Sequence, residues 1–128
     1  METFDSLAGE VAAAGADLVI THGEPHAGNL LRTVDQVLLV DWDTVGLGLP
    51  ERDLWLVTSD PDELSVYTEA TGRPVDTAAI ELYRLRWQLD DIALFTSLFR
   101  SAHARTPDTE KAWRSLCGYL RSEVQQRT

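Results

Sequence analysis

Residues 21–31 read THGEPHAGNLL, and residues 40–43 read VDWD. Two short, largely apolar segments lie between the polar ends of these stretches, at residues 30–32 and 37–40, and a turn at residues 33–36 separates them. Apolar segments that flank a short turn are typical of a β-hairpin, so we interpret them as its two arms. A hairpin returns the chain on itself. We therefore expect the loop before the first arm to meet the carboxylates after the second.

The polar side chains at the open end of this hairpin are of the type that binds a hard cation. Glu24 and Asp41 supply carboxylates, and Asn29 supplies an amide oxygen. Mg²⁺ prefers oxygen ligands, takes few of them from the protein, and keeps water and phosphate oxygens in its remaining positions. The sequence therefore predicts that Glu24, Asn29 and Asp41 gather around a divalent-ion pocket, with Asp43 as a further metal ligand.

Three motifs in this part of the chain carry a family resemblance. They read HGEPHAGN at residues 22–29, DWD at residues 41–43 and ERDLW at residues 51–55. Together they resemble the catalytic core of the kinase-like antibiotic phosphotransferases, the family that holds aminoglycoside and spectinomycin kinases. That family shows a His-Gly-Asp-x-His-x-x-Asn loop, an Asp at the end of a hairpin, and a later Asp-Leu that opens a helix. The resemblance is close over residues 19–57 and loose over the helical remainder, and three motifs in order make it specific.

The resemblance implies both a fold and an activity. The implied fold is α+β and mostly α-helical, the C-terminal lobe of a protein-kinase-like fold with one small β-hairpin. A length of 128 residues fits a single domain over residues 1–128. The implied activity is transfer of the γ-phosphoryl group of ATP to a hydroxyl of an aminoglycoside-like antibiotic or other small molecule, with Mg²⁺ as the metal cofactor. Such a reaction is a route to antibiotic resistance.

The resemblance also assigns roles to the motif residues. Glu24 stands at the position of the catalytic Asp, which orients the acceptor hydroxyl and takes its proton. Glu is one methylene longer than Asp, and a misplacement of about 1 Å can cost about a hundredfold in rate. We expect a shift of the loop to compensate, and the alternative is that the base function is weakened. Asn29 and Asp41 match the family's Mg²⁺ ligands, and Asp43 adds direct or outer coordination.

Two further pairs of residues have roles to be tested. In the resembled fold, the equivalents of His22 and Asp53 support the catalytic loop and take no part in the chemistry. Asp90 and Asp91 form an acidic pair on the longest predicted helix. One interpretation is that Asp90 and Asp91 bind a substrate ammonium group. The other is that they lie on a solvated helix face or pair with arginines of the same helix.

A zinc-dependent hydrolase is an alternative interpretation of the same loop. His22, Glu24 and His26 alternate, and on an extended strand alternate residues face one way. Two imidazoles and a carboxylate are a typical set of Zn²⁺ ligands in a hydrolase. Gly23 and Pro25 favour a loop instead of a strand, and no further His or Cys lies nearby in the sequence.

The composition and charge of the chain limit the classes of partner that it is expected to bind. The formal net charge of -10 disfavours nucleic acid and anionic membranes. It suits a polycationic substrate such as an aminoglycoside, although an acidic surface also serves solubility alone. No apolar run approaches the roughly 20 residues of a membrane span. Cys117 is the only cysteine, which excludes an internal disulfide and favours a reducing cytoplasm.

The N-terminal ATP-covering lobe of a kinase has no counterpart in this sequence. Such a lobe carries a Gly-rich loop and a Lys paired with a Glu, whereas the sole lysine here is Lys111. We therefore expect the isolated chain to bind ATP weakly and to be inactive or incomplete as an enzyme. An uncovered apolar lobe surface would favour a homo-oligomer, and the chain would then be a non-catalytic, self-associating or binding module.

The remaining apolar periodicity and breaker residues predict five helices and one irregular segment. The segment Gly46–Pro50 is expected to be irregular, because glycine and proline oppose regular structure. The helices are expected over residues 1–14, 53–58, 60–71, 76–103 and 110–124.

Overall fold

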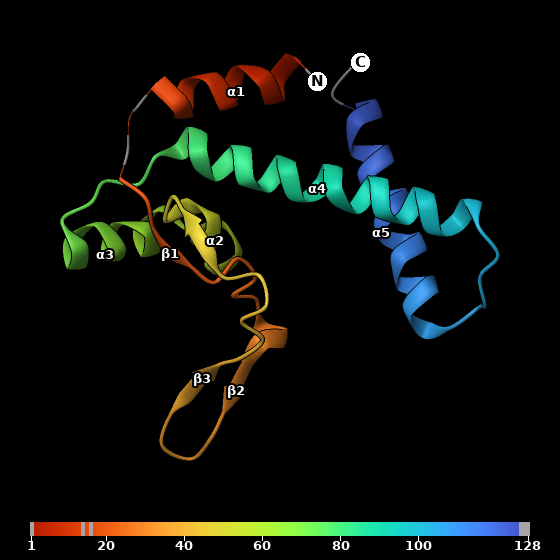
Figure 1. The fold of residues 1–128 in the computed structure, drawn as a ribbon, viewed down its shortest axis with the longest axis horizontal. Helices are drawn as coiled ribbons and strands as arrows, with labels where there is room; N and C mark the ends of the chain where they lie inside the picture. Colours follow the sequence, from red (N-terminus) through yellow and green to blue (C-terminus); the bar gives the residue numbers. More distant parts are fainter. Residues whose placement is uncertain (1, 14, 16, 126–128) are drawn as a thin grey trace. The chain divides into compact units, whose positions relative to one another are not determined.

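The computed structural model describes residues 2–13, 15 and 17–125, which form two compact units, Met1–Arg84 and Leu85–Thr128. The division falls within the longest helix, where the sequence predicted one domain over residues 1–128. Helices and short strands follow one another along the chain (Figure 1). Their bounds are α1 Glu2–Ala13, β1 Val19–Thr21, a 3₁₀ turn Ala27–Asn29, β2 Leu30–Arg32, β3 Val37–Leu39, β4 Gly46–Gly48, α2 Glu51–Val57, α3 Pro61–Thr71, α4 Thr77–Arg100 and α5 Pro107–Gln125.

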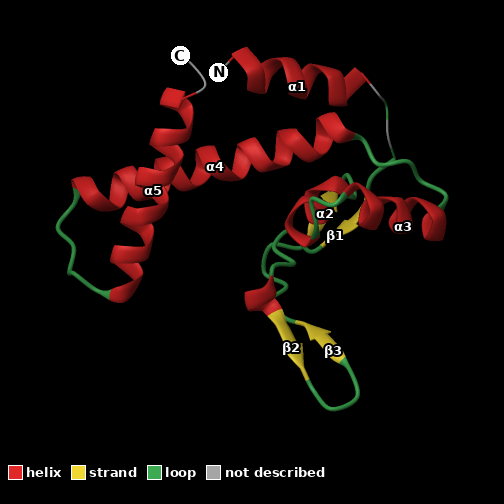
Figure 2. Ribbon diagram, turned by 180° about the vertical axis from the view of Figure 1, so that it is seen from behind, coloured by secondary structure: helices red, strands yellow, loops and turns green. Residues whose placement is uncertain are grey.

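The predicted hairpin is confirmed (Figure 2). Strands β2 and β3 pair in antiparallel fashion, with Leu31 opposite Leu38. Thr33 closes the turn, because its amide donates to the Gln36 carbonyl at 2.8 Å and its hydroxyl accepts from the Gln36 amide at 3.1 Å. The second arm ends at Leu39, one residue earlier than expected.

The prediction that residues 46–50 are irregular is wrong for their first half. Strand β4 pairs antiparallel with β1, with Thr21 opposite Gly46. The Thr21 hydroxyl donates to the Gly46 carbonyl at 2.9 Å and fastens the pair. A Cβ on Gly48 would lie 3.1 Å from Cδ of Arg52, so glycine leaves room for the arginine stem. Pairing with β1 thus forms a strand from a Gly-Leu-Gly segment, where propensity alone opposes one.

The first two helices after the strands begin at identifiable signals. Helix α2 starts at Glu51, two residues earlier than predicted, because Pro50 has a helical backbone and serves as the N-cap. Helix α3 starts as predicted, with Asp60 as the N-cap accepting from the Asp62 amide at 2.9 Å. It ends at Gly72, whose φ of 71° is the left-handed conformation that glycine adopts at helix ends.

The two long helices differ from their predicted bounds at their ends. Asp76 caps α4 by accepting from the Ala78 amide at 2.8 Å, and the helix ends at Arg100, short of the expected residue 103. Helix α5 begins at Pro107, three residues before the expected residue 110. Proline suits the first position of a helix, and the Thr106 hydroxyl accepts from the Thr109 amide at 3.2 Å.

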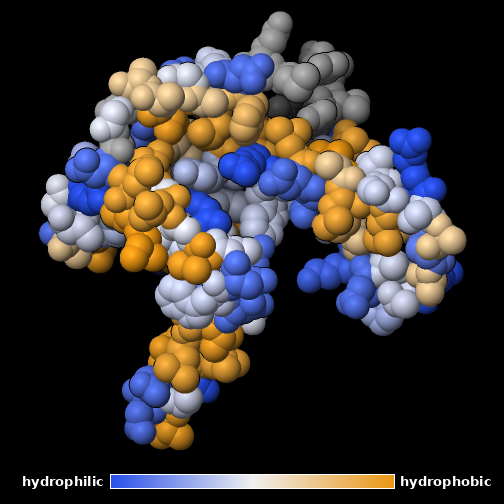
Figure 3. Space-filling model, viewed as in Figure 1, coloured by the Kyte–Doolittle hydropathy of each residue, from blue (hydrophilic) through white to orange (hydrophobic). Residues whose placement is uncertain are grey.

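Much apolar surface stays exposed in the described part of the chain. The sheet residues Ile20 and Leu47 are 76% and 72% exposed, and Figure 3 shows apolar surface over the β2–β3 hairpin. Leu89 and Leu94 of α4 are also exposed. Among the residues whose burial is described, the buried apolar side chains are Leu49, Ala79, Ala112 and Leu116. None of the described helices has the length and hydropathy needed to cross a membrane.

Candidate functional site

Helix α2 holds the backbone at the start of the loop through the carboxylate of Asp53. The two oxygens of this carboxylate accept hydrogen bonds from the amides of His22 and Gly23, each at 2.7 Å. Hydrogen bonds to a charged acceptor are stronger than those between neutral groups. Asp53 therefore lies where a residue that supports the loop would lie, with both oxygens occupied by the backbone.

His22 connects the loop to the end of the hairpin. It is 2% exposed, and its Nε2 lies 2.9 Å from the Val40 carbonyl, while its Nδ1 accepts from the Glu24 amide at 3.2 Å. This pair of partners requires the tautomer with the proton on Nε2. The His22 carbonyl accepts from the Thr44 hydroxyl at 2.8 Å, and the Trp42 ring meets the imidazole edge-to-face at 4.7 Å. His22 thus acts as a buried connector of the loop.

Asn29 links the loop at residues 22–29 to the segment that follows β3. Its side-chain amide donates to the Glu24 carbonyl at 2.9 Å, and its backbone carbonyl accepts from the Val40 amide at 2.9 Å. The residue is 8% exposed. Its Oδ1, the atom that binds metals in proteins, makes no hydrogen bond in the described part of the chain. These bonds join residue 29 directly to residue 24 and to the neighbour of Asp41.

Asp41 has an unusual backbone conformation. Its φ is 65°, the one positive value for a residue other than glycine among those described. The left-handed region costs an ordinary residue about 1–2 kcal/mol, and Asp tolerates it better than most because its side chain is short and polar. Backbone outliers of this kind occur often at functional sites. The carboxylates of Glu24, Asp41 and Asp43 have no hydrogen bond or ion pair within the described residues.

The donor set fits Mg²⁺ better than a metal that needs many protein ligands. No three side chains of the His, Cys, Asp or Glu type lie together as a metal-binding group among the described residues. Glu24, Asp41 and Asp43 therefore do not form a three-carboxylate cluster. An amide oxygen from Asn29 and a carboxylate from Asp41 remain, and Mg²⁺ is commonly bound by one or two protein groups together with substrate phosphates.

The zinc interpretation fails on the same geometry. Both ring nitrogens of His22 are occupied by backbone groups, and Nδ1 of His26 accepts from the Gly28 amide at 3.1 Å. His22, Glu24 and His26 do not come together as a metal-binding group in the described structure. The physical reason is local, because Gly23 has a φ of 97° and the loop is not the extended strand that would align alternate side chains.

Arg52 is a residue of this region that the sequence analysis missed. Its guanidinium donates to the Thr21 hydroxyl at 2.6 Å and to the Thr44 carbonyl at 2.8 Å. A Cβ on Gly23 would collide with the same guanidinium. Arg52 therefore ties the end of β1 to the segment before β4 and packs against the loop. The sequence offers one indication of this role, because Arg52 directly precedes Asp53 in the motif at residues 51–55.

The two aspartates of α4 have separate partners. The Asp91 carboxylate accepts from the Tyr119 hydroxyl at 2.7 Å, and Asp90 lies 3.7 Å from Nε of Arg86 in an exposed ion pair. Burial, followed by the bond to Asp91, raises the pKa of Tyr119 to about 12. Asp90 thus pairs with an arginine of its own helix, as the structural interpretation has it, whereas Asp91 pairs with Tyr119 of α5, and a role of either in substrate binding stays a prediction.

The other ion pair at the start of α4 joins Glu81 to Arg84. The hydrogen bond from Arg84 lowers the pKa of the Glu81 carboxylate, and the same bond raises the pKa of the guanidinium. Arg84 therefore pairs with a carboxylate three positions before it and not with Asp90 or Asp91.

Comparison with known proteins places this geometry in a family. Residues 2–95 match the family described as the phosphotransferase enzyme family. Over 116 residues the chain is 33% identical to Protein StrN of Streptomyces griseus, a match that covers 89% of this chain and 34% of that protein.

Two solved structures of spectinomycin phosphotransferase, APH(9)-Ia, have a similar fold. One is in complex with ADP and spectinomycin and superposes with a TM-score of 0.70 at 22% identity. The other is the AMP-bound complex, with a TM-score of 0.69 at 22% identity. Each match covers 91% of this chain and 38% of the solved chain. The chain thus spans about a third to two fifths of the length of the relatives it matches. The α+β, mostly helical fold of a kinase-like C-terminal lobe is confirmed.

Proposed function

Because the chain belongs to the phosphotransferase enzyme family, we propose that its loop serves transfer of the γ-phosphoryl group of ATP to a hydroxyl of a small molecule. The observation that carries the proposal is the set of bonds around Asn29. Its side chain bonds to the backbone of Glu24 and its backbone bonds to Val40, so the base and the metal-ligand positions adjoin one another. Phosphoryl transfer needs little beyond positioned groups and neutralised charge.

Each loop residue has a distinct task in this proposal. Glu24 orients the acceptor hydroxyl and takes its proton, since its carboxylate has no partner in the described part of the chain. Asn29 and Asp41 would hold Mg²⁺, and Asp43 would contribute a direct or water-mediated contact. When bound, Mg²⁺ supplies positive charge against the phosphate oxygens. His22 and Asp53 keep the loop backbone in place.

The Glu in place of the family's Asp is accommodated by a loop with a firmly held backbone. The Glu24 amide donates to His22, and the Glu24 carbonyl accepts from Asn29. Since both backbone groups are held, we infer that the added methylene is absorbed by the side-chain rotamer. A glutamate so placed would retain the base function with reduced precision.

The acceptor is proposed by class only. Spectinomycin is bound in one of the structures of similar fold, and the net charge of -10 would attract a cationic antibiotic. An aminoglycoside-like antibiotic is therefore our proposed substrate, and other small-molecule hydroxyls are the alternatives. The setting we propose is the cytoplasm, where ATP and Mg²⁺ are available.

The exposed apolar surface supports a second candidate function, self-association. Ile20 and Leu47 lie opposite each other in the β1–β4 pair and are largely exposed. Contiguous exposed apolar surface is typical of interaction sites. We propose that this chain on its own forms a dimer or higher oligomer and binds Mg-ATP only weakly. A monomer at high concentration in sedimentation, or micromolar Mg-ATP affinity in calorimetry, would contradict these two statements respectively.

Phosphoryl transfer can be followed by ³¹P NMR at millimolar ATP and Mg²⁺ with spectinomycin and an aminoglycoside as acceptors. We expect slow formation of a phosphorylated antibiotic. Glu24→Gln should lower the initial rate by about a hundredfold, because a general base typically contributes at least that factor. Glu63→Gln, an exposed change on α3, is the control and should leave the rate unchanged. An unchanged rate in Glu24→Gln would contradict the proposed role of Glu24.

A further inference from the structure

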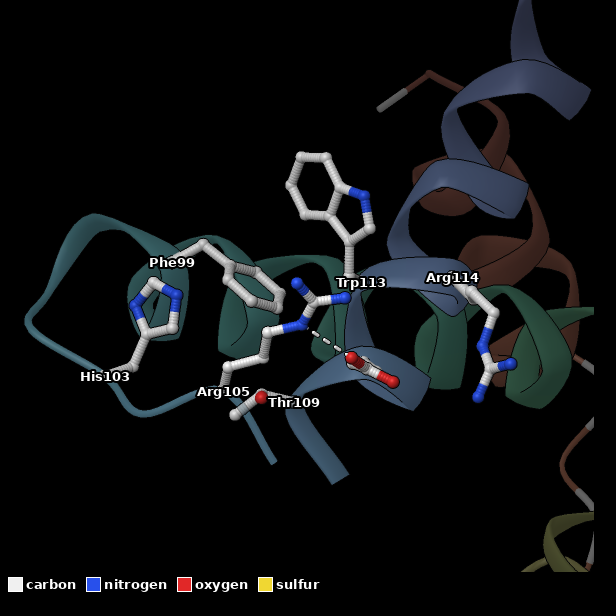
Figure 4. Close-up of a pocket in the computed structure, with 7 residues that line it drawn as sticks. Phe99, His103, Arg105, Thr109, Trp113 and Arg114 are labelled. Atoms are coloured by element: carbon white, nitrogen blue, oxygen red, sulfur yellow. Dashed lines mark hydrogen bonds and ion pairs between the residues drawn. The ribbon is translucent and has the colours of Figure 1, made fainter. Parts of the chain in front are cut away.

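A cavity of about 600 Å³ lies within the Leu85–Thr128 unit, between the end of α4 and the first half of α5. Figure 4 shows the side chains that line it, which come from α4, from the connecting segment at residues 101–106 and from α5. Pockets of about 300–1,000 Å³ are the usual size for small-molecule ligands. The residues assigned above to phosphoryl transfer all lie in the other unit, so this cavity is built from different residues.

One part of the cavity wall is aromatic. The Phe99 ring meets the Trp113 ring edge-to-face, with centroids 5.2 Å apart, and meets the His103 ring in the same manner at 5.1 Å. Trp113 is nevertheless 53% exposed, so one large aromatic side chain has ring surface open to solvent. Aromatic rings gain from stacking and edge contacts with other rings. This part of the wall would therefore accept a planar ring.

The other part of the wall is cationic. The Nε of Arg105 donates to Glu110 at 2.7 Å, and the terminal amino groups of Arg105 have no partner among the described residues. Arg114 likewise has no hydrogen bond or ion pair there. Two guanidinium groups and one carboxylate line this part of the cavity, so it carries net positive charge in a chain whose overall charge is -10. Guanidinium groups bind carboxylates and phosphates through paired hydrogen bonds.

We propose that this cavity binds a small organic anion that carries an aromatic ring. The ring lies against Phe99 and Trp113, and the anionic group meets the free amino groups of Arg105 and Arg114. The same chemistry is presented by aromatic carboxylates and by aromatic phosphate esters, which are the two ligand sources to be distinguished. A polycationic antibiotic is not a ligand of this cavity, because the two guanidinium groups repel it.

Isothermal titration calorimetry with three matched compounds tests the proposal on the chain itself. Naphthalene-2-carboxylate and 1-naphthyl phosphate carry the ring and the charge, whereas 2-naphthamide has the ring without the charge. We expect at least one anion to bind about tenfold more tightly than the amide, because charged hydrogen bonds to guanidinium are lost in the amide. Tighter binding of the carboxylate identifies carboxylates as the ligand class, and tighter binding of the phosphate identifies phosphate esters.

Substitutions locate the binding to this cavity. Arg114→Gln should weaken anion binding by about tenfold, and Trp113→Leu by about fivefold, through loss of a charged bond and of ring contact. Arg121→Gln is the control, because it removes the same charge from an exposed position of the same helix outside the cavity wall. It should change the affinity for the anion by less than about twofold. The side chains at 113 and 114 are exposed, so their variants are expected to fold.

Three results would overturn the proposal. The first is no measurable heat with either anion at millimolar concentration. The second is equal affinity for the anions and the amide. The third is a loss of affinity in Arg121→Gln as large as that in Arg114→Gln, which would mean that general charge and not this cavity attracts the anion.

Discussion

The loop at residues 21–31 and the helices of the Leu85–Thr128 unit differ in how far apart in the sequence their bonded residues lie. In the loop, His22 bonds to Asp53 and to Val40, residues that are 31 and 18 positions away in the sequence. In the helical unit, the exposed ion pairs join near neighbours, four and five positions apart. Long-range bonds to a partly buried carboxylate define a single loop geometry, whereas exposed local pairs contribute little. The four predictions that follow run from the largest effect to the smallest.

Asp53→Ala should be the most destabilising of these changes. It removes the acceptor of two backbone amides, those of His22 and Gly23. Each hydrogen bond to a charged group contributes about 1.5–3 kcal/mol, so we expect the free energy of unfolding, measured in urea, to fall by about 3 kcal/mol. Asp43→Ala, at an exposed position without a partner in the described structure, is the control and should cost under about 0.5 kcal/mol. Similar losses in both variants would contradict the claim that the two bonds to Asp53 stabilise the loop.

Gly23→Ala should have the next largest effect. The glycine φ of 97° is strained for any other residue, and a Cβ would collide with the Arg52 guanidinium. We expect a loss of about 2 kcal/mol in denaturant unfolding. Gly9→Ala lies in α1 with nothing near its Cβ and should instead stabilise by about 0.5–1 kcal/mol. If both glycines respond alike, the loop is not held as described.

Tyr119 bonds to a residue 28 positions away in the helical unit, and it gives a pH dependence. Burial raises its pKa from 10.0 to about 12, with a further contribution from Asp91. The unfolded chain therefore loses this proton first, and the stability that the group contributes is complete below pH 10 and is lost as pH rises towards 12. Urea unfolding between these pH values should show a steeper decline for the parent chain than for Tyr119→Phe. Parallel declines would contradict the raised pKa.

The smallest effect is expected for Arg86→Gln. The Arg86–Asp90 pair is exposed on both sides, at 66% and 76% of its side-chain surface, and its atoms lie 3.7 Å apart. Exposed pairs of this kind contribute about 0.3–0.5 kcal/mol on a helix. The melting temperature of Arg86→Gln should therefore differ very little from that of the parent chain, and the difference should be smaller still at high salt. A loss comparable to that of Asp53→Ala would show that the helical unit depends on its ion pairs.

Local patterns in the sequence predicted the elements whose causes are local. The hairpin followed from apolar arms around a turn, and α3 followed from Asp60, Pro61 and Gly72. Strand β4 could not be predicted, because its glycines form a strand only through pairing with β1 and through the space that Arg52 requires. Helix α5 starts at Pro107, before the predicted residue 110, because proline opposes the interior of a helix but suits its first position.

The candidate site was predictable in its residue types and less so in its connections. The motif order predicts Glu24, Asn29 and Asp41 as site residues, and Asn29 is hydrogen-bonded to the backbones of Glu24 and of Val40, the residue before Asp41. Their roles stay predictions. The positive φ of Asp41 and the bonds of Arg52 arise from tertiary packing, for which the sequence offers no periodic signal. The zinc alternative depended on an extended backbone, which the loop at Gly23 does not have.

The most direct test of the central claim is a titration with Mn²⁺, a paramagnetic substitute for Mg²⁺, followed by the broadening of backbone amide signals in NMR. We expect the amides of residues 24, 29 and 41 to broaden first. Asp41→Asn should abolish this selective broadening, whereas Asp35→Asn, in the exposed hairpin turn, should preserve it. Broadening spread evenly over the acidic surface, or unchanged in Asp41→Asn, would contradict a shared divalent-ion site.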